Sequence, residues 1–293
     1  MNSQAAPFHR GELQAQALAG MTPSGCGIRA FMPMQHQDFF ASLRFMLLAT
    51  HDEHGWPIAT VLHGEPGFVR CLDQNTLRVA VGAHENVIRP MQDAEKKVGM
   101  LGIDFATRRR NRVNGRIVLS DSQGFTAAVE ESFGNCQKYI VPRRLSVAPD
   151  TSPSIAFAFD SIDDQARALV ARSDTMFVAT STGSGLNGGS IDISHRSGPP
   201  GFVDVDADVL TVPDFSGNHY FNSLGNLLLE PRAALLFIDF TNGDILQLQG
   251  RAEILWDMAN PTRLPAVERH WRLHVEQGQW RRGALPLRWQ TWE

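Results

Sequence analysis

The chain has 293 residues, of which 43% are hydrophobic and 20% are charged, and its formal net charge at pH 7 is −4. This composition is typical of a globular protein and leaves room for one large domain or two ordinary ones. Because the charge is mildly acidic and no basic tract is present, the chain lacks the electrostatic footprint of nucleic-acid binding, and we exclude that class of function.

Residues 1–28 are rich in Ala, Gly, Gln, Ser and Pro and show no sustained periodicity, which predicts a mobile or draped N-terminal arm. They contain no apolar segment of the signal-peptide type, and no later run approaches the roughly 18 apolar residues of a membrane helix. We therefore expect a cytoplasmic protein with no membrane partner. The cysteines Cys26, Cys71 and Cys136 are scattered and odd in number, so neither a disulfide framework nor a zinc site is indicated.

The first half continues as a short helix followed by strands. Residues 37–44 can form the helix, and the continuous apolar run 45–50 fits a buried strand. A turn at 51–55 leads into the alternating run 57–63, which predicts the next strand.

The middle of the chain combines a helical pattern with a proline-rich connection. Apolar residues recur at i, i+3, i+4 and i+7 from Phe125 to Ile140, which predicts an amphipathic helix over 125–139. Residues 146–160 indicate a linker. The sequence Ser161-Ile-Asp-Asp then resembles a capping box and predicts the start of another helix.

In the stretch from residue 188 to 256, runs of β-forming residues alternate with polar residues and are separated by Gly, Pro and Asn. One helical insert at about 218–230 interrupts the strands. A further strand is expected at 271–275, before the tail. The pattern predicts a small antiparallel barrel.

The two halves repeat each other. Gly64-Glu-Pro-Gly-Phe-Val matches Gly198-Pro-Pro-Gly-Phe-Val, and further matches follow at a nearly constant offset, at 77–79 with 210–212, 102–105 with 237–240, and 114–116 with 249–251. Two copies of one barrel in one polypeptide are the covalent version of a two-fold dimer. We place the first barrel at 29–145 and the second at 161–293.

The two copies differ in polarity. The second has Asp192-Ile-Ser-His-Arg where the first has Ala59-Thr-Val-Leu-His, and it has Pro213-Asp-Phe-Ser-Gly-Asn-His where the first has Val81-Gly-Ala-His-Glu-Asn. Because only the second copy has a dense polar set, we expect one functional ligand site per chain.

Three runs in the second half have a family resemblance: Pro213-Asp-Phe-Ser-Gly-Asn, Phe221-Asn-Ser-Leu-Gly-Asn and Leu236-Phe-Ile-Asp-Phe. Their succession resembles the flavin-binding split barrel of pyridoxamine 5′-phosphate oxidase and its relatives, over about residues 30 to 290. The resemblance implies a mainly β fold with peripheral helices, of the β-barrel or α+β class. The tandem split barrels would form an intrachain pseudo-dimer that binds FMN in the groove between them.

An FMN site needs charge-assisted forks at the phosphate and hydrogen-bond donors along the ribityl chain and ring. For the phosphate end we expect Arg196, Ser194, His195 and Asn218. For the ribityl chain or the ring, where the resemblance implies a glutamine near the flavin, we expect Asp192, Asn222, Asn226 and Gln247. The residues expected to close the site are Asn135, Lys138, Arg288 and Trp289.

Structural interpretations remain open for several of these residues. Arg196 could instead pair with a carboxylate at a strand end, and Asn222 and Asn226 could bond a neighbouring loop. Arg251 could pair with Asp239 across the sheet. The Asp192, Ser194 and His195 set lacks a nucleophile elbow, so no catalytic triad or other catalytic residue is assigned, and the dispersed histidines indicate no metal site.

The resemblance implies an FMN-dependent oxidoreductase that acts on an unknown small molecule. Without a Gly-x-Gly-x-x-Gly motif, NAD(P)H would bind only transiently against the flavin. Pyridoxamine 5′-phosphate itself is not expected as the substrate, because Ser216-Gly-Asn-His lacks the two cations that the related oxidase has at about this place. The alternatives are a non-enzymatic flavin-binding or sensory module and a heme-binding or heme-degrading split barrel. A homodimer of whole chains is a further expectation.

Overall fold

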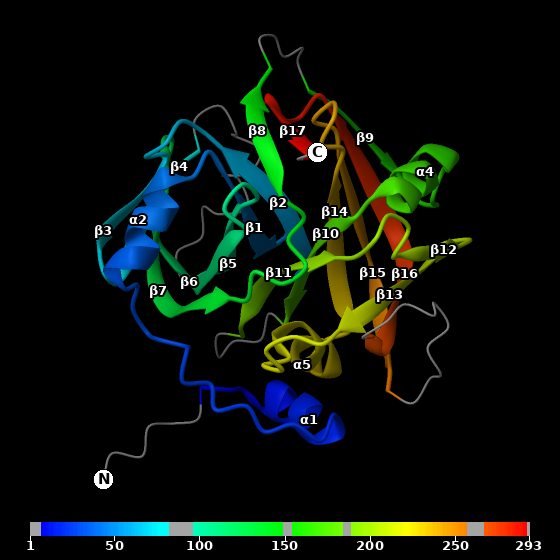
Figure 1. Cartoon of the computed structure of the whole chain (residues 1–293), viewed down its shortest axis with the longest axis horizontal. Helices are drawn as coiled ribbons and strands as arrows, with labels where there is room; N and C mark the ends of the chain where they lie inside the picture. Colours follow the sequence, from blue (N-terminus) through cyan, green and yellow to red (C-terminus); the bar gives the residue numbers. More distant parts are fainter. Residues whose placement is uncertain (1–6, 82–95, 149–153, 184–188, 257–266, 292–293) are drawn as a thin grey trace.

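The molecule consists of two β-barrels of the same topology, one from each half of the chain (Figure 1). The barrels lie side by side, with helix α1 (Arg10–Leu18) below them, next to α5 (Asn222–Leu229). This computed structural model describes residues 7–81, 96–148, 154–183, 189–256 and 267–291. The predicted mainly β fold with peripheral helices is confirmed.

The first barrel is a seven-stranded antiparallel sheet with the strand order β2-β1-β5-β6-β7-β4-β3. Helix α2 (Met34–Ser42) packs Phe39 and Phe40 against its core. Its strands are β1 (Phe45–His51), β2 (Pro57–His63), β3 (Val69–Asp73), β4 (Thr76–Ala80), β5 (Lys97–Asp104), β6 (Arg109–Asp121) and β7 (Gly124–Asn135).

The second barrel repeats this order as β11-β10-β14-β15-β16-β13-β12. Helix α4 (Asp164–Arg172) precedes it as α2 precedes the first barrel, and α5 connects β13 to β14. Its strands are β10 (Thr175–Ser181), β11 (Ile191–Ser197), β12 (Asp204–Asp206), β13 (Val209–Phe215), β14 (Arg232–Ile238), β15 (Ile245–Leu255) and β16 (Val267–Arg282).

The internal repeat extends to single close contacts. A Cβ placed on Gly64 would lie 2.6 Å from the Cβ of Phe68, and a Cβ on Gly198 would lie 2.6 Å from that of Phe202. Both turns therefore require glycine for the same reason, which is the approach of the following phenylalanine. The repeated Gly-x-Pro-Gly-Phe-Val sequence encodes the same turn twice.

The described residues form three hydrophobic cores. Two fill the barrels, and the third lies between them and contains residues of both halves. Strand β1 shows how one sequence serves two cores, because Met46 and Leu48 face the barrel interior while Leu47 and Ala49 face the other barrel. With both faces buried, the strand reads as a continuous apolar run rather than an alternating one.

The predicted helix over 125–139 is wrong, because most of these residues form β7, which pairs with both β4 and β6. Phe125, Ala127 and Val129 alternate into the barrel core. A bulge opposite Gly115 then reverses the phase, and Phe133 packs under the guanidinium of Arg112 on the other face. Because both faces of the strand are buried, its apolar spacing imitates that of a helix.

The linker assigned to 146–160 includes strand residues at both ends. Strand β8 (Arg143–Val147) pairs with β17 (Leu287–Thr291), and β9 (Ile155–Phe159) pairs with β16. Helix α4 begins later than the Ser161 signal indicates, because its N-cap is Asp163, whose carboxylate accepts a hydrogen bond from the Ala166 amide at 2.6 Å.

The N-terminal arm also has more structure than predicted. Helix α1 begins with a capping box, in which His9 accepts from the amides of Gly11 and Glu12 and Glu12 accepts from the His9 amide. Phe8 is buried against Tyr220, with ring centroids 5.4 Å apart. Within the described part of the chain, no helix has the length and apolar character needed to cross a membrane.

Candidate functional site between the barrels

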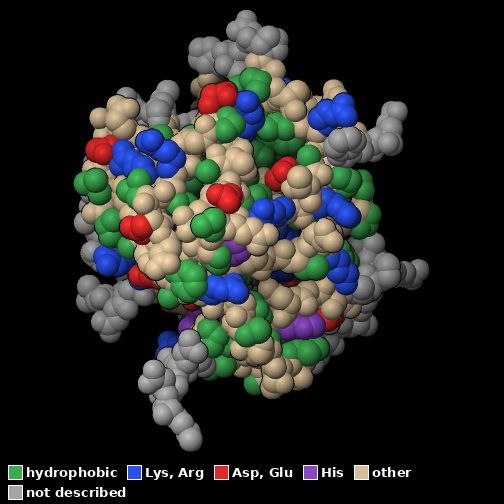
Figure 2. Space-filling model, turned by 60° about the vertical axis from the view of Figure 1, so that its left-hand side comes forward, with side chains coloured by type: hydrophobic (Ala, Val, Ile, Leu, Met, Phe, Trp, Pro, Cys, Tyr) green, Lys and Arg blue, Asp and Glu red, His purple; other side chains and the backbone are tan. Residues whose placement is uncertain are grey.

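A cavity of about 240 Å³ lies where β6 of the first barrel approaches β11 of the second. Its other walls are the turn after β7 and the segment 214–223 before and at the start of α5. The site therefore takes one wall from each copy of the repeat. On the face shown in Figure 2, Lys and Arg side chains are interspersed with Asp and Glu, and some of them lie beside the visible histidine side chains.

Arg112 of β6 reaches across the barrel interface into the second half. Its guanidinium donates to Asp192 Oδ1 at 3.1 Å, to Asn222 Oδ1 at 3.0 Å and to Ser194 Oγ at 2.5 Å. Ser223 Oγ lies 2.9 Å from Ser194 Oγ. The arginine side chain is 5% exposed, so this charge is stabilised by bonds from both halves instead of by water.

Asp192 is the centre of this network. It accepts from Asn114 Nδ2 at 2.7 Å and from Asn226 Nδ2 at 3.2 Å, in addition to Arg112. Asn226 Nδ2 also donates to the carbonyl of Thr180 at 3.1 Å. Asp192 is therefore the buried carboxyl partner of Arg112 across the barrel interface.

His195 is fixed as a neutral imidazole. Arg110 Nη1 lies 2.7 Å from His195 Nδ1, and because a guanidinium only donates, Nδ1 accepts and the single ring proton is on Nε2. Burial, followed by the charges of Arg110, Arg143 and Arg196, holds the pKa of His195 well below its ordinary value of 6.5. The imidazole therefore presents an N–H donor at every pH near neutrality.

The other two cavity arginines differ in their pairing. Arg196 pairs with Asp214 at 3.1 Å, and Asp214 also binds Arg269 at 2.6 Å. Arg110 has no carboxylate partner among the described residues. Burial and the neighbouring charges of Arg112 and Arg196 lower the pKa of Arg110 to about 10, so it stays cationic at neutral pH.

Several N–H groups of the cavity side chains are buried without a hydrogen-bond partner. An unsatisfied buried donor costs roughly 1–3 kcal/mol, more when it is charged, so such groups in one place indicate a ligand that supplies acceptors. They are the Nε atoms of Arg110, Arg112 and Arg196 and the Nε2 atom of His195. These donors suit an anion such as a phosphate, and one buried acceptor without a partner, Asn135 Oδ1, belongs to the same cavity lining.

The remaining wall is an irregular loop. His219 and Phe221 have positive φ angles of 57° and 60°, which non-glycine residues adopt rarely. The loop is held by Tyr139 Oη, which donates to the Ser216 carbonyl at 3.0 Å, and by His219 Nε2, which lies 3.0 Å from Glu268 Oε1. Such strain at a cavity wall is characteristic of functional sites.

The structure brings most of the sequence-predicted site residues together. Asp192 and Asn226 lie in the network directly behind the cavity. Those that line the cavity are Asn135, Lys138, Ser194, His195, Arg196, Asn218 and Asn222. The carboxylate pairing considered for Arg196 is present, with Asp214, while its role at a phosphate stays a prediction.

Three predicted site residues lie elsewhere. Gln247 donates to the Ala59 carbonyl at 2.5 Å, and Arg288 donates to the Leu285 carbonyl at 2.7 Å. Trp289 is buried in the core between the barrels. The repeat explains Gln247, because it occupies in β15 the position that Arg112 has in β6, and therefore lies at the pseudo-symmetric counterpart of the cavity.

The expected Arg251–Asp239 pair is also absent. Arg251 pairs with Glu276 at 3.0 Å, whereas Asp239 pairs with Arg172 at 2.6 Å. The two residues lie at opposite ends of the β14–β15 pair, because Arg251 is opposite Arg232 at the start of β14 and Asp239 follows the end of β14. Glycine 250 is a bulge position, as the sequence suggests.

Sequence reasoning missed Arg110, Arg112 and Tyr139. The polar set of the second copy predicts a site within that copy alone, whereas a site at a pseudo-two-fold takes one wall from each copy. A signal was available in the repeat, because Arg110 and Arg112 stand where the second copy has Ile245 and Gln247. The first copy has charged residues at interior strand positions. These residues indicate that the first barrel supplies the second wall of the cavity.

A family model described as pyridoxamine 5′-phosphate oxidase matches the chain twice, at residues 32–155 and 162–288. The chain belongs to the pyridoxamine 5′-phosphate oxidase family. The predicted resemblance is thus confirmed, and each match spans one barrel.

Solved structures of single barrels are similar to part of this family member. Group A Streptococcus HupZ is 16% identical with a TM-score of 0.31, covering 39% of this chain and 90% of its own. A FAD-binding protein from Mesorhizobium loti is 12% identical with a TM-score of 0.32, covering 44% and 98%. HutZ, a heme storage protein from Vibrio cholerae, is 12% identical with a TM-score of 0.28, covering 40% and 92%. No curated protein matches the chain.

Proposed function

We propose that this chain is a flavoprotein that binds FMN at the cavity between its barrels and acts as an oxidoreductase on a small molecule. The observation that carries the proposal is the set of buried donors without partners on Arg110, Arg112, Arg196 and His195. A phosphate dianion would supply acceptors for all of them and would neutralise Arg110. Membership in the oxidase family supports a flavin as the group that brings the phosphate.

The residues present fit FMN in kind. Arg110 is the first choice for the phosphate, because Arg112 and Arg196 each already have a carboxylate partner. Ser194, Asn218 and Asn222 supply hydroxyl and amide groups for the ribityl chain. A volume of about 240 Å³ is below the roughly 300–1,000 Å³ of typical ligand pockets, so the phosphate and ribityl chain would occupy most of it.

When bound, a flavin supplies hydride and single-electron transfer, which no side chain of the cavity offers. The chain's own residues would bind, orient and exclude water. His195 contributes a fixed Nε2–H donor without a change of charge, and Arg110 holds it in that tautomer. Tyr139 packs at 5.4 Å from Phe215 and gives the cavity an aromatic wall beside its cations.

The absorbance spectrum of freshly purified protein tests this function, followed by mass spectrometry of the compound that acid releases. Released FMN, with bleaching of the flavin band by NADH or NADPH, is the expected result. A flavin that no pyridine nucleotide reduces would favour the non-enzymatic binding module. A colourless protein that gains a Soret band with heme and takes up no FMN would contradict the proposal.

We further propose that NAD(P)H and the substrate bind transiently and that two chains form a homodimer. Duplication buries one two-fold interface inside the chain and leaves apolar strand surface elsewhere, with Ile155 of β9 66% exposed and Phe157 43% exposed. Sedimentation equilibrium should give twice the 32.4 kDa chain mass. A single species at the chain mass would reject the dimer without affecting the flavin site.

A further inference from the structure

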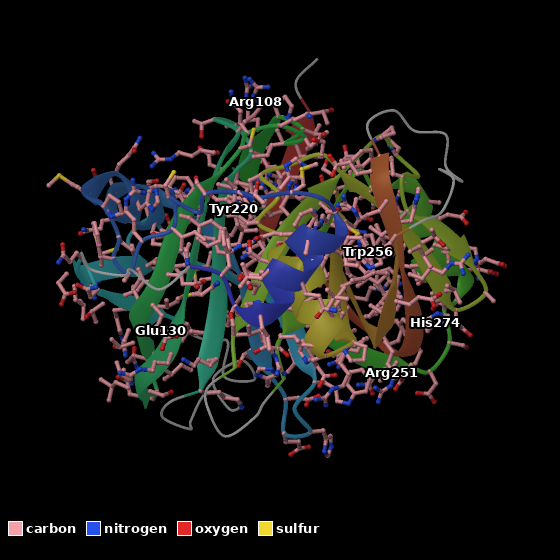
Figure 3. All side chains as sticks on the ribbon, turned by 90° about the horizontal axis from the view of Figure 1, so that it is seen from below. Arg108, Glu130, Tyr220, Arg251, Trp256 and His274 are labelled. Carbon is pink, nitrogen blue, oxygen red and sulfur yellow. The ribbon has the colours of Figure 1, made fainter. Side chains whose placement is uncertain are left out.

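Helix α1 is seated closely on α5 at the base of the two barrels (Figure 3). The contact is made by two glycines. A Cβ on Gly11 would lie 2.2 Å from the carbonyl oxygen of Gly225, and a Cβ on Gly225 would lie 2.6 Å from the Glu12 amide nitrogen. The backbones of the two helices are therefore in direct contact, and this contact fixes the docked position of α1 on α5.

In this docked position of α1 the carboxyl group of Glu12 is buried, and the Glu12 residue is 4% exposed. Glu12 Oε1 accepts from the side-chain amide of Asn222, and Oε2 accepts from the His9 amide at 2.8 Å. Asn222 in turn accepts from Arg112 at 3.0 Å and lines the cavity. The N-terminal helix is therefore joined through one asparagine to the residues of the candidate site.

The groups around Glu12 are short of positive charge. Asp192 of β11 and Glu131 of β7 face it as carboxylates, and Arg112 of β6 is the cation of the cluster, already paired with Asp192. On its own helix, the neutral imidazole of His9 lies 3.6 Å from Oε2, with Arg10 beside it. The buried carboxyl groups of Glu12 and Asp192 and the half-buried carboxyl group of Glu131 thus share one buried guanidinium, so the docked state favours a proton within this cluster.

Burial, and then the charge of Asp192, raise the pKa of Glu12 to about 8. Burial and Asp192 likewise raise the pKa of Glu131 to about 7. A carboxyl with a raised pKa stabilises docking at low pH, and this contribution is lost as pH rises through the docked value. His9 has the opposite sign, because burial lowers its pKa, so acid below about pH 6.5 weakens docking through His9.

We infer that α1 is a proton-operated clasp, docked behind the cavity while Glu12 carries a proton and released when Glu12 ionises. Below about pH 6.5 the contributions of His9 and Glu12 to docking have opposite signs. Above about pH 6.5 the ionisation of Glu12 weakens docking without that opposition. Release removes the bond from Asn222 to Glu12 and opens the rear of the Arg112 network to water. The inference does not depend on which ligand the cavity binds.

Hydrogen–deuterium exchange of the peptide covering residues 10–18 tests the clasp, with rates corrected for the intrinsic effect of pH. In the wild-type chain, protection should fall by about tenfold per pH unit between about pH 6.5 and 8 and then level off. Glu12→Gln should abolish this fall, because an amide cannot ionise. Glu65→Gln is the matched control, since Glu65 is an exposed glutamate paired with Arg44 far from α1.

Gly11→Ala defines the released state, because its methyl group cannot fit against the Gly225 carbonyl, and its peptide should exchange rapidly at every pH. Wild-type protection that is constant from pH 6.5 to 8.5 would overturn the inference, and so would a fall of the same size in Glu12→Gln. The wild-type titration is decisive alone if a variant does not fold.

Discussion

At the scale of single residues, the cavity is defined by the way charges are paired. Arg112 and Asp192 neutralise each other across the barrel interface, Arg196 is held by Asp214, and Arg110 is bonded to a neutral histidine. Among these arginines, Arg110 is therefore the one whose charge remains for a ligand. Because all these groups are buried or half-buried, each pairing has a larger effect than it would at the surface.

Removing Arg112 should destabilise the fold. Arg112→Ala leaves Asp192 as a buried charge without its cation, which costs about 3–5 kcal/mol of unfolding free energy. Denaturant unfolding measures the change. Arg44→Ala, which breaks the exposed pair with Glu65, is the control and should cost at most about 1 kcal/mol. Equal effects of the two substitutions would show that the Arg112 network is unimportant for stability.

His195 should remain neutral far below its ordinary pKa of 6.5. Its pKa is lowered in the folded state, so its contribution to stability is present above pH 6.5 and is lost as pH falls toward the folded value. Nitrogen-15 NMR of the imidazole should show the Nε2–H tautomer unchanged from pH 8 to 6. Titration near pH 6.5, or an Nδ1–H tautomer, would contradict the bond from Arg110.

At the scale of elements, the sequence predicts a strand correctly where turn residues mark both of its ends. The prediction fails where both faces of a strand are buried, because apolar and polar residues then no longer alternate. The run 45–50 and the insert at 218–230 were predicted correctly as β1 and α5. The apolar spacing of β7 predicts a helix, because Phe133 on the second face of the strand packs against Tyr220 of the other half. That information belongs to tertiary packing and is not present in local spacing.

The repeated Gly-Arg pair has a structural role in both copies. Gly115 and Gly250 each follow a bulge, and a Cβ on either would lie 2.0 Å from a carbonyl oxygen of the neighbouring strand, that of Ala128 or His274. Gly250→Ala should therefore lower the unfolding free energy by about 1–3 kcal/mol.

Gly134→Ala in β7 is the control for this substitution. A Cβ there would meet its nearest atom at 3.5 Å, an ordinary contact, and the backbone φ is not positive. Thermal unfolding should show little or no loss of stability for it. If Gly250→Ala is tolerated equally well, the two strands must separate more easily than their contacts indicate.

At the scale of the whole molecule, the two barrels are related by a pseudo-two-fold axis but have different residues at the equivalent sites. The repeat and the two barrels could be read from the sequence, and so could most residues of the second half of the site. The wall from the first half could not be placed, because it depends on how the two copies face each other. The counterpart of the cavity is occupied by Gln247 and Gln249, which donate to the Ala59 and Pro57 carbonyls.

This asymmetry predicts one ligand per chain. Equilibrium dialysis with FMN should saturate at one molecule per chain, because Gln247 and Gln249 are engaged with the backbone of β2 and provide no cationic donors. Saturation at two per chain would show that the counterpart site also binds and that the duplication is functionally symmetric.

The most direct test of the central claim is the affinity for FMN of the wild-type chain and of Arg110→Gln, measured by quenching of flavin fluorescence. The account predicts that Arg110→Gln binds FMN at least about tenfold more weakly, because a charge-assisted bond to phosphate is worth roughly 1.5–3 kcal/mol. Arg78→Gln, whose Arg78 pairs with Asp121 in the first barrel, should bind as the wild type does. Unchanged affinity in folded Arg110→Gln would contradict the placement of the phosphate between the barrels.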